Sequence, residues 1–172
     1  MKENLLIIGA GIYGLIAKEI AESMGCFDRI AFVDDGAKVT PNGIPVIGAG
    51  ADLLALSQDY QAAVVAIGNP SVRLSLLQKI EAETPLRIAT LVSPWAYVSP
   101  SAQVGKGSII EPMAVIHAEC VIEQGCLISA GAVVNHASRC CEGVHVDCNA
   151  TVAGNTTVPA KTKVFSATVF KA

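Results

Sequence analysis

The chain has 172 residues, of which 52% are hydrophobic but only 5% aromatic, and its formal net charge is −3. This length fits one domain or two small ones, and the slightly acidic balance gives no reason to expect nucleic acid or an anionic membrane as a partner. The longest uncharged apolar stretch, residues 5–17, is too short to span a bilayer and is followed by no signal-peptide cleavage pattern, so we expect a cytoplasmic protein.

The first half of the chain alternates apolar runs with helical patterns. Leu5–Ile8 is continuously apolar, which predicts a strand buried on both faces. Gly25 is the expected C-cap of the helix that follows, and the buried face of this helix is predicted to comprise Ile12, Leu15, Ile16, Ile20 and Met24. The remaining elements are predicted as strands over residues 30–33, 62–67 and 87–91 and helices over 51–57 and 72–83. We therefore expect a Rossmann-like parallel α/β domain over residues 1–88, with Asn69 or Ser71 capping its last helix.

A glycine-rich loop joins the first strand to the first helix. Gly9, Gly11 and Gly14 have the GxGxxG spacing, and Asp34 follows the last glycine by 20 residues. Glycines at these positions let the backbone approach a phosphate group, and the acid can accept from a ribose hydroxyl. The alternative is a purely structural tight turn. Binding of NAD is not expected, because a dinucleotide normally requires two mononucleotide-binding halves and this domain has room for little more than one.

From Val92 onward the sequence repeats every six residues. Val or Ile occupies twelve of the thirteen positions at this spacing, and these positions are Val92, Val98, Val104, Ile110, Ile116, Ile122, Ile128, Val134, Cys140, Val146, Val152, Val158 and Val164. The residue four places later is nearly always small. Six residues suffice for one short strand and one tight turn, with the β-branched residue in the core and the small one at the corner.

This tract resembles the hexapeptide repeat of the left-handed parallel β-helix, and we assign residues 89–172 to that all-β domain. The left hand and the three hexads per turn are implied by the resemblance. Of the six cysteines, Cys120 and Cys126 take corner positions and Cys140 a core position, so they are expected to act as small hydrophobic residues. No Cys-x-x-Cys pair occurs, and neither a zinc site nor disulfides are expected.

A small Rossmann-like domain followed by a left-handed β-helix is similar to the sugar O- and N-acyltransferases, which acetylate sialic acids or nucleotide-linked amino sugars. The resemblance covers most of the chain, from Leu5 to about Thr157. The motifs that carry it are Gly-Ala-Gly-Ile-Tyr-Gly at 9–14, Phe-Val-Asp-Asp at 32–35, Ala-Ile-Gly-Asn at 66–69 and Val-Asn-His at 134–136.

The resemblance implies roles for individual residues. His136 matches the general base, His145 a residue near the thioester of acetyl-CoA, and Gly154 a glycine whose N–H stabilises the oxyanion. The uridine nucleotide of the acceptor is expected to contact Gly11, Ile12, Tyr13, Asp34, Asp35 and Gly68. A histidine that is neutral near pH 7 suits direct transfer, which needs no metal. A homotrimer is also implied.

Other interpretations of the histidines were considered. A histidine on the outside of a solenoid is often only a surface residue, and this is how we interpret His117. Three histidines on a β-helix also resemble the γ-class carbonic anhydrases, but the spacings of 19 and 9 residues differ from that family, which also lacks the front domain.

The sequence departs from the acyltransferase family at three places. Ala137 stands where an acidic residue usually follows the base, which predicts a slow enzyme, and Tyr13 stands where a histidine is usual. Members also usually continue for another coil, so residues 164–165 and 169–170 were expected to fold back as a cap. These departures leave a second hypothesis open, a non-catalytic trimeric protein that binds a nucleotide sugar. The identity of the acceptor, and N- versus O-acetylation, are not encoded in any motif.

Overall fold

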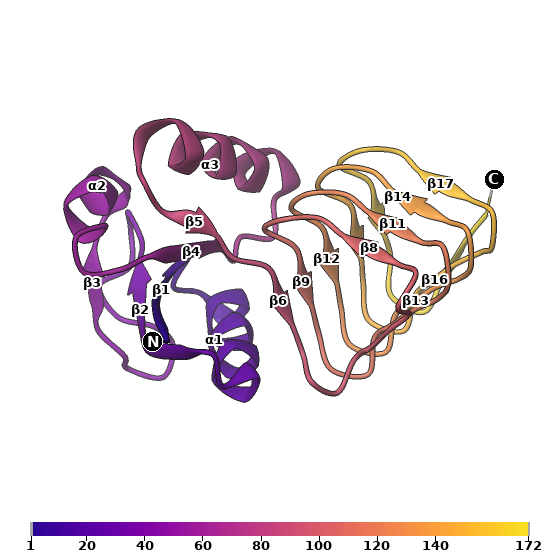
Figure 1. Ribbon diagram of the computed structural model, residues 1–172, viewed down its shortest axis with the longest axis horizontal. Coiled ribbons are helices and arrows are strands. Elements are labelled where there is room, and N and C mark those ends of the chain that lie inside the picture. Colours follow the sequence, from indigo (N-terminus) through magenta and orange to yellow (C-terminus); the bar gives the residue numbers. More distant parts are fainter. Residues whose placement is uncertain (1, 172) are drawn as a thin grey trace. The chain divides into compact units, whose positions relative to one another are not determined.

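A computed structural model describes residues 2–171, which divide between Ala89 and Thr90 into two units (Figure 1). The N-terminal unit is built on a parallel sheet with the strand order β3-β2-β1-β4-β5. Its strands are β1 (Glu3–Ile8), β2 (Phe27–Val33), β3 (Val46–Gly48), β4 (Ala62–Val65) and β5 (Arg87–Ile88). Its helical elements are α1 (Ile12–Met24), the 3-10 turn η1 (Gly50–Asp52), α2 (Leu53–Leu56) and α3 (Pro70–Glu83).

The helices cover both faces of this sheet, with α1 on one face and α2 and α3 on the other (Figure 1). This is the arrangement that right-handed crossovers produce when the chain moves outward from β1 in both directions. The strand order reverses next to β1, between β1 and β4. In open parallel sheets of this kind, ligands bind at the carboxyl ends of the strands at that reversal.

The predicted buried face of α1 is only partly confirmed, because Ile20 is buried but Leu15, Ile16 and Met24 are half-buried. Its buried residues are Gly14, Ala17, Ile20 and Ala21, whereas Ile12 is 63% exposed. Small side chains let this helix approach the sheet closely, and a Cβ on Gly14 would lie 2.1 Å from the carbonyl oxygen of Gly9. The hydrophobic periodicity was therefore misleading here, because close packing selected glycine and alanine over larger aliphatic residues.

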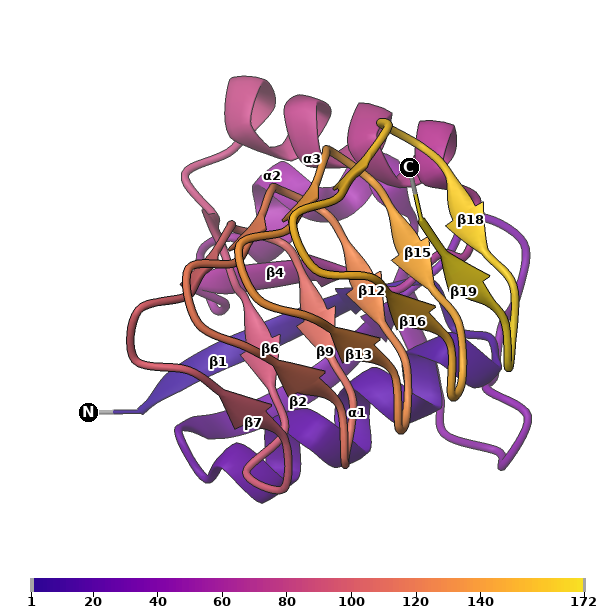
Figure 2. The same cartoon turned by 90° about the vertical axis from the view of Figure 1, so that its right-hand side faces the viewer.

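The C-terminal unit is a β-helix made of two-residue strands. They are β6 (Leu91–Val92), β7 (Tyr97–Val98), β8 (Gln103–Val104), β9 (Ile109–Ile110), β10 (Val115–Ile116), β11 (Val121–Ile122), β12 (Leu127–Ile128), β13 (Val133–Val134), β14 (Arg139–Cys140), β15 (His145–Val146), β16 (Thr151–Val152), β17 (Thr157–Val158), β18 (Lys163–Val164) and β19 (Val169–Phe170). Each strand pairs in parallel with the third strand after it, as in Val115 with Val133, 18 residues later. The result is three sheets, and Figure 2 shows the sheet of β6, β9, β12, β15 and β18.

The predicted core and corner positions are confirmed in the β-helix. The second residue of each strand points inward, and from Ile110 to Val158 every one of these side chains is at most 1% exposed. Most of the small residues at the corners are buried as well, including Cys120, Cys126 and Ala132 at 0%, whereas Thr168 in the last coil is exposed. Fully burying one Val or Ile contributes about 1.5–3 kcal/mol, so the repeated core is the main source of stability in this unit.

Two expectations about the ends of the β-helix were wrong. The predicted strand over residues 87–91 is divided, because β5 completes the α/β sheet whereas β6 begins the first coil. Residues 164–165 and 169–170 do not fold back as a cap, since β18 and β19 continue the coil by pairing with β15 and β16. Phe170 takes the core position and packs against the end of the core.

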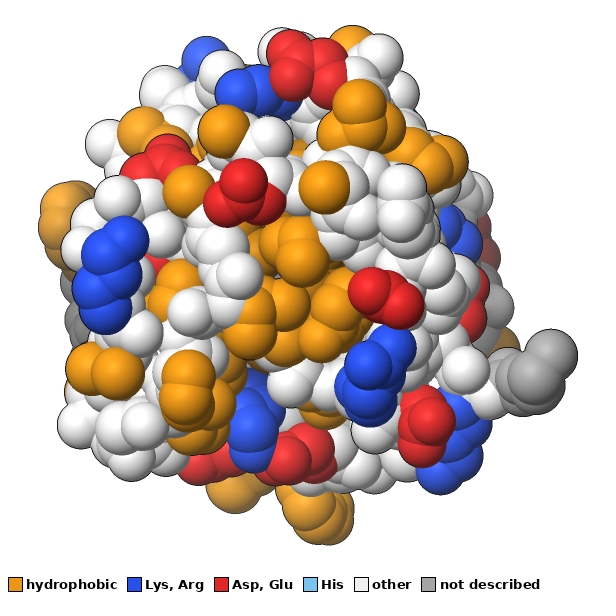
Figure 3. All heavy atoms as spheres, turned by 90° about the vertical axis from the view of Figure 1, so that its left-hand side faces the viewer, with side chains coloured by type: hydrophobic (Ala, Val, Ile, Leu, Met, Phe, Trp, Pro, Cys, Tyr) orange, Lys and Arg blue, Asp and Glu red, His pale blue; other side chains and the backbone are white. Residues whose placement is uncertain are grey.

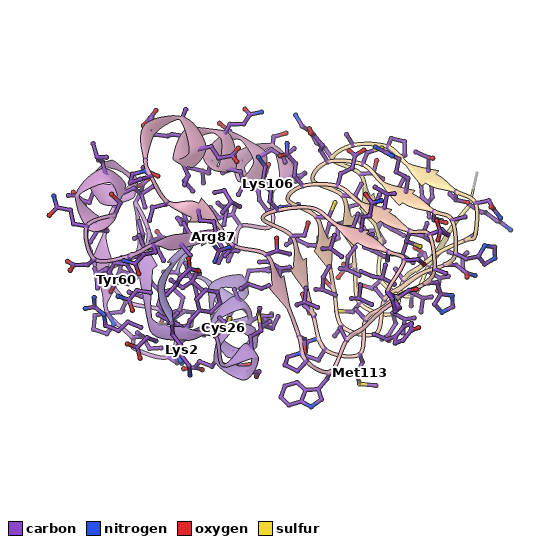
Figure 4. All side chains as sticks on the ribbon, in the orientation of Figure 1. Lys2, Cys26, Tyr60, Arg87, Lys106 and Met113 are labelled. Carbon is purple, nitrogen blue, oxygen red and sulfur yellow. The ribbon has the colours of Figure 1, made fainter. Side chains whose placement is uncertain are left out.

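Every corner from residue 107 to 167 contains one residue in the left-handed region. This residue follows the core residue by three places, and four of these positions are glycine. Met113 (φ 62°), Glu119 (φ 60°) and Ala137 (φ 52°) are among the residues that adopt this conformation with a side chain, and Met113 points away from the β-helix in Figure 4. A left-handed conformation costs a non-glycine residue about 1–2 kcal/mol.

Replacing Glu119 by glycine is expected to raise the free energy of unfolding by about 0.5–1 kcal/mol, because glycine has no Cβ penalty at this φ. The exposed neighbour Ala118 does not have a positive φ, so Ala118→Gly is expected to lower it by about as much, through a more flexible unfolded chain. Chemical denaturation of both variants measures the difference. A shift in the same direction for both would contradict this account of the corners.

Candidate functional site

The glycine-rich loop of the N-terminal unit lies at the carboxyl end of β1. Gly9 has φ +109°, and a Cβ there would lie 2.8 Å from the carbonyl oxygen of Ala66. Gly11 forms the N-cap of α1 without a side-chain cap, and no atom lies within 4 Å of where its Cβ would be. Packing therefore requires glycine at positions 9 and 14. At Gly11 the space around the backbone is empty, so a ligand can approach it there.

Asp34 holds the loops around this site together. One carboxylate oxygen accepts from the N–H of Ala10 at 2.9 Å, and the other accepts from Gly36 at 2.9 Å and Ala37 at 2.8 Å. The hydrogen bonds from Ala10 and then Ala37 lower the pKa of Asp34, against burial, which raises it. The predicted contact with a ribose would have to use the remaining lone pairs of this carboxylate, because both oxygens already accept from the backbone.

A cavity of about 250 Å³ opens beside these loops. Its lining residues are Ile8, Gly9, Val33, Asp34, Asp35, Gly50, Leu53, Ile67, Val72 and Leu76. One Asp35 oxygen accepts from the N–H of Gly50 at 2.7 Å, which joins the end of β2 to η1. An apolar cavity with a few polar groups at the carboxyl ends of parallel strands suits a small organic ligand.

The loop after β4 completes one wall of the cavity. Asn69 caps α3 by accepting from the N–H groups of Ser71 and Val72, so of the two predicted caps Asn69 is the one used. Arg73, which is fully buried, donates from Nη1 to the carbonyl oxygens of Ile67 at 2.7 Å and Gly68 at 2.9 Å. Sequence analysis missed Arg73, because nothing in a single sequence shows that a helical arginine turns inward.

The β-helix brings His136 and Gly154 together. They lie 18 residues apart on neighbouring coils, and a Cβ on Gly154 would lie 2.8 Å from Cε1 of His136. The two corners are joined by Ser138, whose hydroxyl donates to the carbonyl oxygen of Ala153 and accepts from the N–H of Thr156. Glycine at 154 therefore leaves room for the imidazole, which is exposed at its corner as predicted.

The N–H of Gly154 is available as a hydrogen-bond donor. At this corner position the ladder does not use the N–H, and at two corners the preceding side chain accepts from it, Asn135 for His136 and Asp147 for Cys148. Ala153 has no acceptor, and within residues 2–171 the Gly154 N–H donates no hydrogen bond. A free donor beside an exposed imidazole is suited to stabilising charge on a reacting carbonyl oxygen.

The other histidines lie elsewhere on the β-helix. His117 contacts Asn135 through its Nδ1, with 3.0 Å to the Asn135 side-chain oxygen, so it supports the residue that precedes His136. His145 is only 6% exposed and lies in β15, which belongs to a different sheet from β13, the strand before His136. Within one chain the structure therefore unites His136 with Gly154 and leaves His145 on another face.

Several general features of the surface were examined. Across residues 2–171, no group of three or more His, Cys, Asp or Glu side chains could hold a metal ion, and the helices described there lack the length and apolar character of a membrane span. On the face of the N-terminal unit in Figure 3, acidic and basic side chains alternate around a central group of apolar ones. That face offers no continuous basic surface for a nucleic-acid backbone.

Comparisons with known proteins agree with this architecture. The family model for the PglD N-terminal domain matches residues 4–80, and that for the bacterial transferase hexapeptide (six repeats) matches residues 101–136. No curated protein matches the chain. The matches confirm the predicted fold class, a Rossmann-like α/β unit followed by a left-handed β-helix.

Two solved structures of the acetyltransferase domain of PglB from Neisseria gonorrhoeae FA1090, one of them in complex with acetyl coenzyme A, share 31% sequence identity with the chain. Each has a TM-score of 0.92 and covers 98% of this chain and 82% of the other. PerB from Caulobacter crescentus, in complex with CoA and GDP-perosamine, shares 25% identity with a TM-score of 0.83, covering 98% of this chain and 88% of the other.

The contacts of Asp34 predict a pH dependence of stability. Because its pKa is lowered in the folded state, its contribution is complete above the unfolded pKa of about 3.9 and is lost as the pH falls through the folded value. Asp34→Asn should flatten the fall in unfolding free energy below about pH 5 and cost about 1–3 kcal/mol at neutral pH, since one backbone donor loses its acceptor. Denaturation over this pH range tests it, with the exposed Asp59→Asn as control; equal pH profiles for both variants would exclude this role.

Proposed function

Because this chain belongs to the sugar acyltransferases that join a PglD-type N-terminal domain to hexapeptide repeats, we propose that it transfers the acetyl group of acetyl-CoA to a nucleotide-linked amino sugar. The observation that carries the proposal is the contact between His136 and Gly154, which sets a base beside a free N–H donor. The relative seen with GDP-perosamine favours a nucleotide-linked amino sugar over free sialic acid as the acceptor.

The chemistry follows from this pair of residues. Acetyl-CoA supplies an activated acyl group as a thioester. His136 takes a proton from the acceptor amine as the amine attacks the thioester carbon, so that a C–N bond forms and the C–S bond breaks. The N–H of Gly154 donates to the carbonyl oxygen as that oxygen becomes negative. The proton is finally returned to the departing thiolate, and no covalent bond to the protein is needed.

The N-terminal unit provides the binding site for the nucleotide in this proposal. Gly11 leaves the approach to the N-terminus of α1 open, which favours a phosphate group. Gly68 lies in the loop held by Arg73, and Asp35 lines the cavity. Ile12 and Tyr13 form the first turn of α1 rather than a loop, and the exposed side chain of Ile12 is suited to contact with a base or sugar.

We further infer that the protein is a homotrimer in which His145 reaches the thioester. One β-helix sheet supports a subunit interface, because most of its outward side chains are apolar: Tyr97, Val115, Val133, Thr151 and Val169. Tyr97 is 56% and Val169 61% exposed in the single chain. Association of copies would cover these side chains and form a site between subunits, where we place the contact of His145 with the thioester.

Replacing His136 by alanine tests the function. Acetyl transfer to a nucleotide-linked amino sugar should fall about 100-fold or more, the usual contribution of a general base. Calorimetric binding of the nucleotide sugar and the mass in solution should remain unchanged. His117→Ala removes a histidine that is not part of the proposed mechanism and should cost much less. Full turnover by His136→Ala, or no binding of acetyl-CoA by the folded wild type, would refute the proposal.

The absent acidic neighbour can be restored at position 137. Glu119 occupies the same corner position one coil earlier with nearly the same φ, so glutamate can adopt this backbone conformation. Ala137→Glu should raise kcat several-fold, because a carboxylate beside the imidazole orients it and strengthens it as a base. Ala137→Gln is the uncharged control. Equal rates for both variants would mean that another group orients His136.

A further inference from the structure

His145 lies in a cluster of polar side chains on the β-helix. It is flanked in its sheet by Leu127 of β12 and Lys163 of β18, and it is 6% exposed. A buried imidazole is unfavourable unless polar partners compensate for the loss of water. Two of its polar neighbours are Ser129, which is 1% exposed, and Asp147.

Both partners meet the same nitrogen of His145. The Ser129 hydroxyl lies 3.1 Å from Nε2, and one Asp147 carboxylate oxygen lies 3.8 Å from it. In a Ser-His-Asp triad the serine and the carboxylate bind opposite nitrogens, so that the carboxylate orients the ring while the other nitrogen takes the serine proton. The cluster is therefore not a nucleophilic triad, and the carboxylate acts on the charge of the ring instead.

Asp147 is held as a carboxylate by groups from the same coil and the next one. One oxygen accepts from the N–H of Cys148 at 2.9 Å, and the other lies 2.9 Å from Nζ of Lys163. Burial raises the pKa of Asp147, but the hydrogen bonds from Lys163, Cys148 and Ser166 outweigh it, and with the nearby His145 they bring this pKa to about 2. Asp147 is therefore negative throughout the neutral range.

Glu111 and Cys148 lie near Asp147 in the same cluster. Glu111 is 6% exposed and accepts from the N–H of Ala130 at 3.1 Å. Burial and then the charges of Glu111 and Asp147 raise the pKa of the Cys148 thiol, which shows that both carboxylates act on this corner. The negative charge of Asp147, 3.8 Å from Nε2 of His145, favours a positive charge on the ring.

We propose that Asp147 is a positioning residue that keeps His145 protonated and fixed against Ser129, so that His145 serves as a cationic donor while His136 serves as the base. The inference rests on the proposed function. An imidazolium carries N–H groups on both nitrogens and can only donate, which suits a group beside a thioester oxygen. Within residues 2–171, no ion pair or hydrogen bond joins the His136 ring to a carboxylate, so the two histidines have different environments. Such a difference separates acid and base roles.

The test is a pH titration of the three histidine Cε1–H signals by NMR, assigned with single His→Gln variants. Asp147→Asn should lower the His145 midpoint by about 1 pH unit or more, the usual effect of losing a carboxylate at this range. The midpoints of His117 and His136 should stay in place. Glu119→Gln, which removes an exposed carboxylate elsewhere on the β-helix, should move none of the three. An unmoved His145 midpoint in folded Asp147→Asn would overturn the proposal.

A second variant keeps the proposal testable where Asp147→Asn fails to fold. The side chain of Lys163 is 46% exposed, so Lys163→Gln should be tolerated, and removing this cation should raise the His145 midpoint. A lowered or unchanged midpoint would count against the proposal. The titrations need no acetyl-CoA, so a protein that shows the expected shifts without any acetyl transfer would refute the proposed function and leave the role of Asp147 intact.

Kinetics of Asp147→Asn then connect the two proposals. kcat for acetyl transfer should fall by about tenfold or more above the new His145 midpoint and recover as the pH is lowered through it. The KM for the nucleotide sugar should stay within about twofold. Asp147→Glu, which keeps the charge, should restore most of the rate. A loss of kcat that is the same at every pH would show a purely structural role for Asp147.

Discussion

The pairing of each strand with the third strand after it is the constraint on which the C-terminal unit depends. It places every residue next to the residue 18 positions away, as in the register of Val115 with Val133. Side chains 18 residues apart therefore lie next to each other on neighbouring coils. The neighbour of His136 at this spacing is Gly154, which leaves room for the imidazole. In a stacked repeat, a functional pair needs only the correct spacing, since the apolar core of each coil supplies the rigid support.

The corners also decide which backbone groups are available for chemistry. The ladder leaves one N–H at each corner unused, and three corners have a proline at this position, which has no N–H to satisfy: Pro94, Pro100 and Pro112. At His136 and Cys148 a preceding Asn or Asp accepts from this group, and at Ala130 and Glu142 a glutamate of the previous coil does so. At Ala153 the acceptor is missing, and the N–H of Gly154 stays available. A small change in side chain thus converts a structural corner into a donor for a developing negative charge.

Two carboxylates, Asp34 and Asp147, hold neighbouring backbone or side-chain groups in place. Asp34 accepts from three backbone N–H groups and so joins the glycine-rich loop to the turn after β2. Asp147 is neutralised on one side by Lys163 and faces His145 on the other. The family's usual acid after the base is replaced by Ala137, whereas His145 has a carboxylate within 3.8 Å.

The sequence alone determined the division into an α/β half and a β-helix and the core and corner positions, whereas His136 and Gly154 were singled out separately by resemblance to one family. The core and corner positions can be recognised directly in the sequence, because a repeat of six residues fixes which side chains point inward. Other features depended on tertiary packing. The buried face of α1 is made of Gly14, Ala17 and Ala21, together with Ile20, because the helix lies close to the sheet. Arg73 and Asp147 acquire their roles from partners that no local pattern encodes, since a carbonyl oxygen or an imidazole becomes their neighbour only when the chain has folded.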